Sequence, residues 1–197
     1  MIPLTMPGIL ANIALHVDLS PSEQELFLSR TSVEQVKART VLHHAGTVCR
    51  QSFFVNSGIL RSFTINDHIV EHVLNIACQG WWISDMYSLI SQKPGDLFID
   101  VVEDAEVVIL LKEDQELLYR EIPKLERFFR ILVENALVAN QQRIMDKLSL
   151  TAEARFEKFC AKYPGLVAQL PQRMIASYIG VTPEFFSRMK ANLLKRG

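Results

Sequence analysis

The chain has 197 residues, of which 49% are hydrophobic and 22% charged, so it can fold as one large domain or two small ones with packed cores. It contains no apolar run of the ~18 residues that a membrane helix needs and no basic leader, so we expect a cytoplasmic protein with no membrane partner. Three scattered cysteines, Cys49, Cys78 and Cys160, exclude a disulfide framework and a closely spaced iron–sulfur ligand set.

The net charge of −1 argues by itself against nucleic acid, but the charge is unevenly distributed. Residues 155–197 contain eight Lys and Arg against two acids, a balance of +6, so the rest of the chain carries −7. An acidic body with a basic C-terminal module is typical of a sensor joined to a DNA-binding unit. A chance cluster of charge on a solvated face is the alternative interpretation.

Two short helices are expected before a long β region. A weak helical pattern covers residues 6–16, and Ser20-Pro21-Ser22-Glu23 is a capping box that starts a helix ending near Arg30. From Val33 to Leu111, short runs rich in Val, Ile and Phe alternate with turn residues. This pattern predicts a β-sandwich or barrel-like roll of about eight strands.

Glycine pairs and one Asn-Asp pair are expected at the turns of this roll. Glycine supplies the positive φ that such turns need. Asn66-Asp67 lies between two alternating runs, which is typical of a hairpin tip. The glycine pairs are Ala45-Gly46, Ser57-Gly58 and Gln79-Gly80, and the strand residues expected beside the tip are Thr64, Ile65, Ile69 and Val70.

The strand pattern is interrupted between Gly80 and Asp100. Asp85 to Ser91 predicts one or two helical turns, and a loop follows. A short helix and a loop inside a roll can hold a small anion on backbone N–H groups. For Asp85 we prefer a helix cap, and we expect Trp81-Trp82 in the core. The residues of the candidate effector pocket are Gly80, Ser84, Asp85, Lys93, Gly95 and Asp96.

Helices dominate the remainder of the chain. A helix from Glu113 to Glu121 ends before Pro123, which opens a second helix to about Leu148. At about 37 Å, this second helix is longer than one small domain needs. An apolar stripe at three- and four-residue spacing predicts a coiled coil, and therefore a homodimer through residues 123–149. Asn140 either pairs with its symmetry mate or faces solvent, and the stripe consists of Leu125, Phe128, Phe129, Leu132, Val133, Ala136, Leu137, Ile144 and Leu148.

Residues 170–194 predict a helix-turn-helix unit, which follows a helix from Thr151 to Tyr163. Gly180 ends the first helix of the unit because glycine tolerates the left-handed conformation. Thr182 caps the second helix, and Pro183 occupies its first position. The apolar residues that pack the two helices together are Met174, Ile175, Ile179, Val181 and Phe186.

Polar and basic side chains follow the cap of the second helix. We expect Arg188 to contact guanine in a bidentate manner, Glu184 to accept from cytosine and Thr182 to bind a phosphate. Phe185 or Phe186 is expected to face inward, and an ordinary pair of packed helices is the alternative. The residues expected on double-stranded DNA are Gln172, Thr182, Pro183, Glu184, Ser187, Arg188 and Lys190.

The order of these segments resembles the Crp/Fnr family of bacterial transcription regulators, of the cyclic-AMP receptor protein type. The resemblance covers nearly the whole chain and rests on Phe53–Phe63, the turn at Gly80, Val102–Leu110, the long helix and the tail 175–190. It implies a regulator that reads a pseudo-palindromic operator, and it allows RNA polymerase as a partner. It aligns Glu184 and Arg188 with the base-reading pair of the family.

Two departures from the family pattern affect what the resemblance implies. Pro183 replaces a common Arg, and the chain stops at Gly197 before the usual β-hairpin wing. In the cyclic-nucleotide cassette, Ser84-Asp85 stands where the family has Gly-Glu, and Gly95-Asp96 stands near its Arg-Ser/Thr pair. Because Gly95 supplies no charge and Asp96 repels phosphate, we expect no tight binding of cyclic AMP, no cofactor and an unknown effector. Lys93 offers only a flexible point charge in compensation.

Metal and enzyme sites find little support in the pattern. Adjacent residues of a strand point to opposite faces, so His43-His44 cannot easily share one ion, and His68 and His72 are too far apart along a strand. No nucleophile elbow or paired carboxylates are present, so we expect neither a metal site nor an enzyme. The alternatives are a cupin-like ligand-binding or metal-dependent enzyme domain with a helical tail, and a regulator that has lost its ligand response.

The predicted fold class is α+β. It comprises a cyclic-nucleotide-binding-like β-roll (jelly-roll) in residues 1–122, a dimerisation helix in residues 123–149, and a winged-helix-like helix-turn-helix domain with a truncated wing in residues 150–197.

Overall fold

The computed structural model describes residues 7–196, which divide into two compact units. The first unit consists of residues 7–64 and 74–134, and the second of residues 65–73 and 135–196. The boundary therefore falls inside the long helix α5 (Lys124–Ser149), and the hairpin tip at 65–73 belongs to the second unit. Every helix within residues 7–196 is too short or too polar to span a lipid bilayer.

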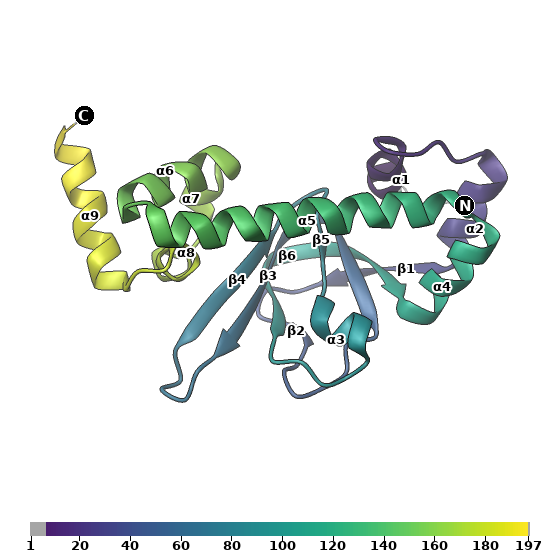
Figure 1. The fold of residues 1–197 in the computed structure, drawn as a ribbon, viewed down its shortest axis with the longest axis horizontal. Coiled ribbons are helices and arrows are strands. Elements are labelled where there is room, and N and C mark those ends of the chain that lie inside the picture. The colour runs from purple at the N-terminus through teal and green to yellow at the C-terminus, as the bar shows by residue number, and fades with distance from the viewer. Residues whose placement is uncertain (1–6, 197) are drawn as a thin grey trace. The chain divides into compact units, whose positions relative to one another are not determined.

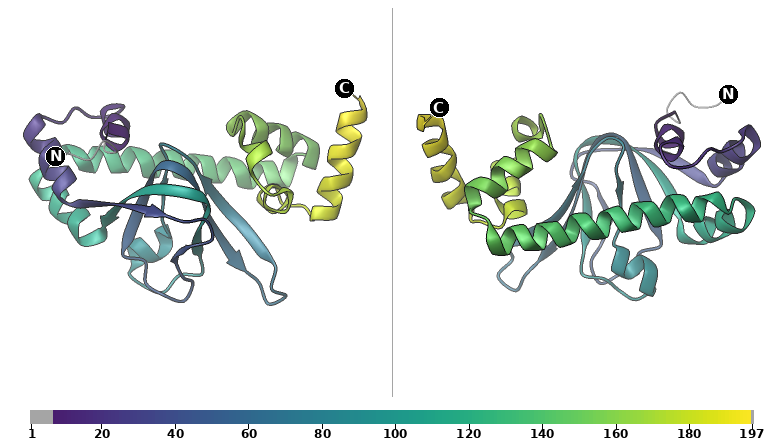
Figure 2. Two further views of the ribbon diagram at one scale, coloured as in Figure 1. Left: turned by 180° about the vertical axis from the view of Figure 1, so that it is seen from behind. Right: turned by 45° about the horizontal axis from the view of Figure 1, so that its top comes forward.

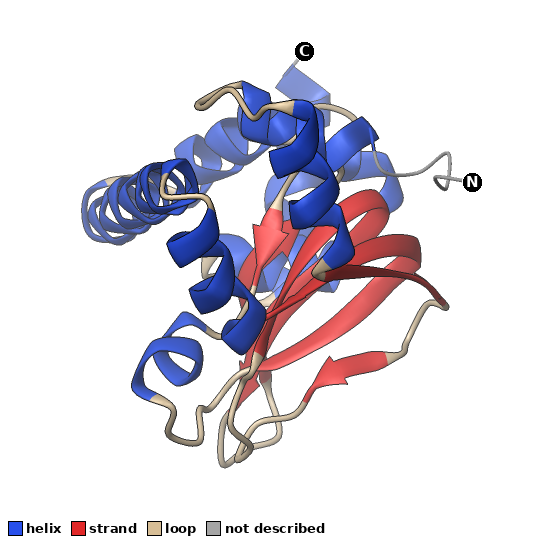
Figure 3. Ribbon diagram, turned by 90° about the vertical axis from the view of Figure 1, so that its right-hand side faces the viewer, coloured by secondary structure: helices blue, strands red, loops and turns tan. Residues whose placement is uncertain are grey.

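The first unit is a curved antiparallel sheet with short helices (Figure 1). Its strands follow the order β1-β6-β3-β4, while β2 pairs with β6 and β5 with β3. The long strands arch over at one end of the sheet (Figure 2) and appear as the extended red ribbons of Figure 3. The strands are β1 (Thr31–Val36), β2 (Val41–His43), β3 (Gln51–Ile65), β4 (Glu71–Ala77), β5 (Trp82–Ile83) and β6 (Phe98–Leu111). The helices are α1 (Pro7–Ala14), α2 (Pro21–Ser29), α3 (Met86–Ser91) and α4 (Lys112–Glu121).

Successive residues of a strand point to opposite faces, and this alternation builds two cores in the first unit. Phe53 and Val107 belong to the core inside the roll. Their neighbours Phe54 and Val108 belong to the second core, which contains side chains of α1, α2, α4 and the start of α5. Trp82 joins this second core, with its ring centroid 5.4 Å from that of Phe54. The prediction that the tryptophans are core residues is therefore confirmed for Trp82, whereas Trp81 is 37% exposed.

The prediction of about eight strands was wrong: the sheet has six. Ser57-Gly58, expected at a turn, lies inside the 15-residue strand β3. The pairing of β3 with β6 shifts register between Val55 and Ser57 and again between Ser57 and Ile59. Gly58 has φ +84°, and a Cβ atom there would collide with the backbone of Asp104. The glycine thus forms a β-bulge that bends one long strand, instead of a turn that separates two short ones.

The hairpin tip at Asn66-Asp67 is confirmed, but Ile69 and Val70 lie outside the strands. The Asn66 side-chain oxygen accepts hydrogen bonds from the backbone N–H groups of His68 and Val70, at 3.1 and 3.0 Å. Ile69 takes the left-handed conformation, with φ +60°. The tip is therefore longer than predicted, because an Asn side chain in place of a strand partner satisfies its backbone donors.

The second unit is helical and has an aromatic core. The helix predicted from Thr151 to Tyr163 is α6, and Thr151 caps it, since its hydroxyl accepts from the N–H of Ala154 at 3.2 Å. The rings of Phe159, Tyr163 and Tyr178 pack together with centroids 5.0 to 5.8 Å apart. The helices that follow α5 are α6 (Ala152–Lys162), α7 (Leu166–Gln169), α8 (Gln172–Ile179) and α9 (Pro183–Arg196), of which the four-residue α7 was not predicted.

Helix α5 buries its apolar residues only near its start. Leu125 and Phe128 are fully buried, and Phe129 is nearly so. Further along, the same three- and four-residue spacing continues, but its large side chains are exposed in the single chain. The exposed members of the stripe are Val133, Leu137, Ile144 and Leu148.

Candidate nucleic-acid interface

Helices α8 and α9 form the predicted helix-turn-helix, and local capping fixes the turn between them. Gly180 has φ +78°, and the N–H of Val181 donates to the carbonyl of Ala176 at 3.0 Å. The Thr182 hydroxyl accepts from the N–H of Phe185 at 3.2 Å and so caps α9. Pro183 occupies the first position of α9, where its missing N–H has no cost.

One face of α9 is buried against the rest of the second unit. Phe186 is fully buried, with its ring edge-on to that of Phe156 at 5.1 Å, and Met189 is 5% exposed. Of the two phenylalanines, Phe186 is therefore the one that faces inward, because Phe185 is 45% exposed. Lys190 is half-buried and lies near Cys160 of α6, so it is set apart from the exposed face of the helix.

The opposite face of α9 carries the predicted base-reading residues. Glu184, Ser187 and Arg188 are exposed, and their three- and four-residue spacing places them together on one face. Thr182 and Pro183 are exposed at the start of this helix, and Gln172 is exposed at the start of α8. A free helix start carries unpaired N–H groups and partial positive charge, both of which suit a phosphate.

The geometry adds two residues that the sequence analysis missed. Asn192 is exposed four residues after Arg188, so it continues the same face by one helical turn. Phe185 is exposed three residues before Arg188, and an apolar side chain in this place can contact a thymine methyl group. The signal for Asn192 was present in the sequence as the i, i+4 spacing. For Phe185, the sequence did not show whether Phe185 or Phe186 would be buried in the core, and so which ring would be exposed.

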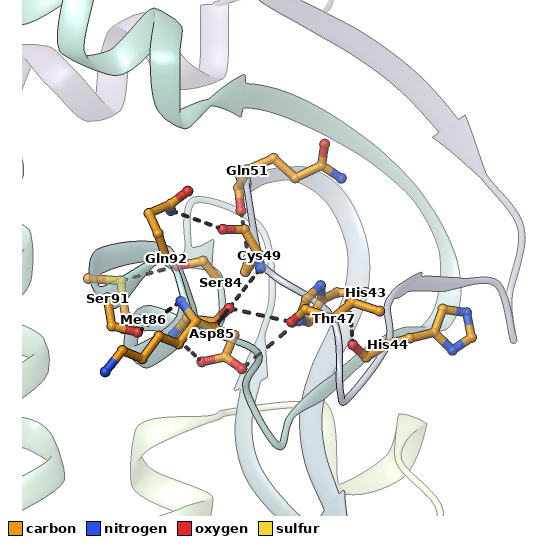
Figure 4. A network of polar contacts seen from close by, with 12 residues as sticks. His43, His44, Thr47, Cys49, Gln51, Ser84, Asp85, Met86, Ser91 and Gln92 are labelled. Carbon is orange, nitrogen blue, oxygen red and sulfur yellow. Dashed lines mark hydrogen bonds and ion pairs between the residues drawn. The ribbon is translucent and has the colours of Figure 1, made fainter.

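The candidate effector pocket is filled by the protein itself (Figure 4). The Asp85 carboxylate accepts from the N–H of Ser88 at 3.1 Å and caps α3, as we had preferred. Gly95 lies so close to this carboxylate that a Cβ atom on it would collide. The Ser88 hydroxyl accepts from the N–H of Cys49 at 2.7 Å and donates to the carbonyl of Lys93 at 2.6 Å. Ser88 thus ties α3 to the loop before β3 and to the loop after α3.

The other predicted pocket residues lie around this network. Ser84 is half-buried, and its hydroxyl contacts the Met86 sulfur at 3.1 Å. Lys93 and Asp96 are exposed. Gly80, with φ +85°, accepts from the Asn12 side chain at 3.2 Å through its carbonyl. Ser84, Asp85, Lys93, Gly95 and Asp96 therefore lie in or beside α3 and the loop after it, whereas Gly80 lies beside Asn12 of α1.

Solved structures are similar to this chain over most of its length. The c-di-GMP responsive global regulator CLP of Xanthomonas campestris has a TM-score of 0.73 at 16% identity, covering 90% of this chain and 93% of that one. A mutant of CooA from Carboxydothermus hydrogenoformans has a TM-score of 0.71 at 17% identity, covering 95% and 85%. A regulator of the Crp/Fnr family from Eubacterium rectale has a TM-score of 0.71 at 17% identity, covering 91% and 86%.

The chain has the Crp/Fnr fold. No protein-family model and no curated protein sequence matches it. The predicted resemblance is thus confirmed at the level of the fold, and the cupin-like alternative is not favoured.

The cassette of this Crp/Fnr fold contains a buried pair that the sequence analysis did not foresee. His43 Nε2 and Asp85 Oδ2 lie 3.9 Å apart, and both side chains are more than nine-tenths buried. Neither atom has a hydrogen-bond partner within the described residues. Burial lowers the pKa of His43, the Asp85 charge raises it and the neighbouring His44 lowers it, so the net pKa of His43 is below its ordinary value.

The free energy of unfolding is therefore expected to fall as the pH is lowered from about 7.5 to about 5.5. The unfolded chain takes up a proton on His43 near its ordinary pKa of about 6.5, whereas the folded chain takes it up only at lower pH. Protons consequently favour the unfolded state across this window. Urea unfolding at several pH values checks this, with His43→Gln expected to show a flatter pH profile than the natural chain.

The matched control is His68→Gln, because His68 is exposed at the hairpin tip. This variant is expected to keep the full pH dependence. Parallel profiles for His43→Gln and the natural chain would show that His43 does not carry the effect.

Proposed function

We propose that the chain is a DNA-binding transcription regulator that places α9 in the major groove. The observation that carries this proposal is the two-sided character of α9. Phe186 and Met189 anchor one face in the core, while Glu184, Ser187 and Arg188 present hydrogen-bonding groups on the other. A capped helix with this distribution is what major-groove readout requires, since Arg and Glu match guanine and cytosine edges.

The proposed regulator is a homodimer that pairs through α5. Val133, Leu137, Ile144 and Leu148 are 45 to 79% exposed in the single chain, although they continue the stripe that is buried at the start of the helix. A second copy of α5 covers this stripe in a two-stranded coiled coil. Asn140 is exposed at the same spacing, so it can face its symmetry mate and fix the register. Two-fold symmetry then matches a pseudo-palindromic operator.

The regulator is further proposed not to bind cyclic AMP tightly. Asp85 already accepts the N–H of Ser88 that a phosphate oxygen would use, and its carboxylate lies beside Gly95, where a phosphate-binding Arg would be needed. Lys93 and Asp96 bring opposite charges to the same loop. The support is therefore electrostatic, because the cassette offers an anion the carboxylates of Asp85 and Asp96 against the single positive charge of Lys93.

Arg188→Ala is expected to weaken binding to an operator selected from random DNA by about 1–3 kcal/mol, because one bidentate base contact is lost. Gel shift or fluorescence anisotropy at fixed salt measures the change. Arg127→Ala is the matched control, since Arg127 is an exposed arginine of the first unit, and it is expected to leave operator affinity unchanged.

The base-reading role of Arg188 predicts that its replacement reduces the preference for the operator over random duplex. An equal loss of affinity for both DNAs would instead make Arg188 a phosphate contact. No loss on a selected operator would remove α9 as the reading element.

A further inference from the structure

A groove of about 500 Å³ lies within the second unit, between the C-terminal half of α5, helix α6 and helix α8. It is separate from the exposed face of α9 and from the cassette in the first unit, and neither the proposed DNA contact nor the proposed dimer uses it. Its lining combines two features, an aromatic wall and a concentration of cations.

The aromatic wall is made by Phe159 of α6 and Tyr178 of α8, which are 2% and 8% exposed. Their ring centroids are 5.4 Å apart with the rings edge-on, so they are fixed by mutual packing. The Arg143 guanidinium lies 5.2 Å from the centroid of the Tyr178 ring. An apolar or aromatic group entering the groove therefore meets a rigid wall with a cation over the face of the Tyr178 ring.

The charge of the groove is strongly unbalanced. Five of its lining residues are Lys or Arg and one is an acid, Asp146, which is already paired with Lys158 at 2.7 Å. Arg155 is held in place, because it donates to the carbonyls of Ile179 and Leu150 at 2.8 and 2.7 Å. Hydrogen bonds to neutral carbonyls leave its positive charge uncompensated.

Lys147 is the centre of this imbalance. Desolvation lowers the pKa of Lys147, and the charges of Arg143 and Arg155 lower it further. No carboxylate in residues 7–196 forms an ion pair with it. The positive charges of Lys147, Arg143 and Arg155 repel one another at the mouth of the apolar groove. A bound negative charge would reduce this repulsion and so stabilise the cluster.

We propose that this groove binds a small organic anion. Its acidic group lies among Arg143, Lys147 and Arg155, and its aromatic or apolar part packs against Phe159 and Tyr178. A pocket with an apolar wall and a few convergent polar groups is the usual form of a small-molecule site, and the volume is in the usual range.

The groove lies beside the stripe of the proposed dimer. Around α5, Arg143 lies about 100–120° from Leu137 and Ile144, and Lys147 about 60–80° from them, at 3.6 residues per turn. The groove also borders the turn of the helix-turn-helix, since the Lys147 Cε atom would lie 3.6 Å from a Cβ atom at Gly180. An occupant thus contacts the helix whose end sets the start of α9.

Titration of the 197-residue chain with anilinonaphthalene sulfonate tests the proposal. This probe is an aromatic anion whose fluorescence rises in apolar sites. Saturable binding is expected, and Lys147→Gln and Arg143→Gln are each expected to raise the Kd about tenfold, as for loss of one charge-assisted contact. The matched control on the same helix is Arg127→Gln, whose side chain is exposed outside the groove and whose Kd is expected to stay unchanged.

Uncharged phenylnaphthylamine is the control that distinguishes an anion site from adsorption to an apolar surface. Its Kd is expected to be the same for the natural chain, Lys147→Gln and Arg143→Gln. Circular dichroism and thermal melting check that the variants are folded. Absence of saturable sulfonate binding, or equal Kd values for Lys147→Gln, Arg143→Gln and Arg127→Gln, would overturn the proposal. So would a Lys147→Gln variant that loses affinity for random duplex DNA and keeps the probe, since the cluster would then be a phosphate contact.

Discussion

Replacing Leu137 with glutamate is expected to dissociate the proposed dimer and to remove tight operator binding. Leu137 is 66% exposed in the single chain and lies in the middle of the α5 stripe. In the dimer, the two glutamates would lie near each other across the two-fold axis, each in an apolar seam. An uncompensated buried charge costs about 3–5 kcal/mol, so the dimer dissociation constant is expected to rise at least about 100-fold.

Sedimentation and operator titration measure the two effects together. A monomer engages one half-site at a time, so it loses the high effective concentration that the second half-site provides. Val138→Glu is the matched control, because Val138 is the next residue, is 65% exposed and points away from the stripe. A dimer that survives Leu137→Glu, or that fails equally in Val138→Glu, would place the interface elsewhere.

Gly58→Ala is expected to destabilise the first unit. At φ +84° an alanine is strained by about 1–2 kcal/mol. The added Cβ would also collide with the carbonyl of Asp104 and with Ala105, and overpacking of this kind costs about 1–3 kcal/mol more. The free energy of unfolding, measured by urea titration, is expected to fall by the sum of the strain and the overpacking costs.

Gly46→Ala is the control that distinguishes the cost of backbone strain from the cost of the steric collision. Gly46 has a similar φ of +80°, but no atom lies within 4 Å of the Cβ position. This variant is expected to lose only the conformational part, about 1–2 kcal/mol. Equal losses in the two variants would mean that β3 relaxes around the bulge, and that the contact with β6 is looser than the structure indicates.

The helix-turn-helix could be predicted because its signals are local. Gly180, Thr182 and Pro183 act on the backbone within a few residues of themselves, so their chemistry determines where α8 ends and α9 begins. The capping box at residues 20–23 is confirmed for the same reason. The exposed side of α9 was predicted for Arg188, and Asn192 continues it by one helical turn that the predicted set did not include.

The roll was predicted less completely because its geometry depends on distant partners. Gly58 has the local appearance of a turn, and only its pairing with β6 makes it a bulge. The contact of His43 with Asp85 joins residues far apart in the sequence and could not be read from spacing. The groove in the second unit has the same origin: Arg143, Arg155 and Tyr178 come from three helices, and their convergence is a property of packing.

The three-residue turn from Gly180 to Thr182 has a thermodynamic consequence for recognition. Its backbone hydrogen bond, its hydroxyl cap and the buried Phe186 hold α9 at one angle to α8 before any DNA arrives. The loss of conformational entropy is thereby incurred during folding and not during association. A helix preorganised in this way keeps more of its contact free energy as affinity, and it discriminates sharply because it cannot bend to accommodate a wrong base.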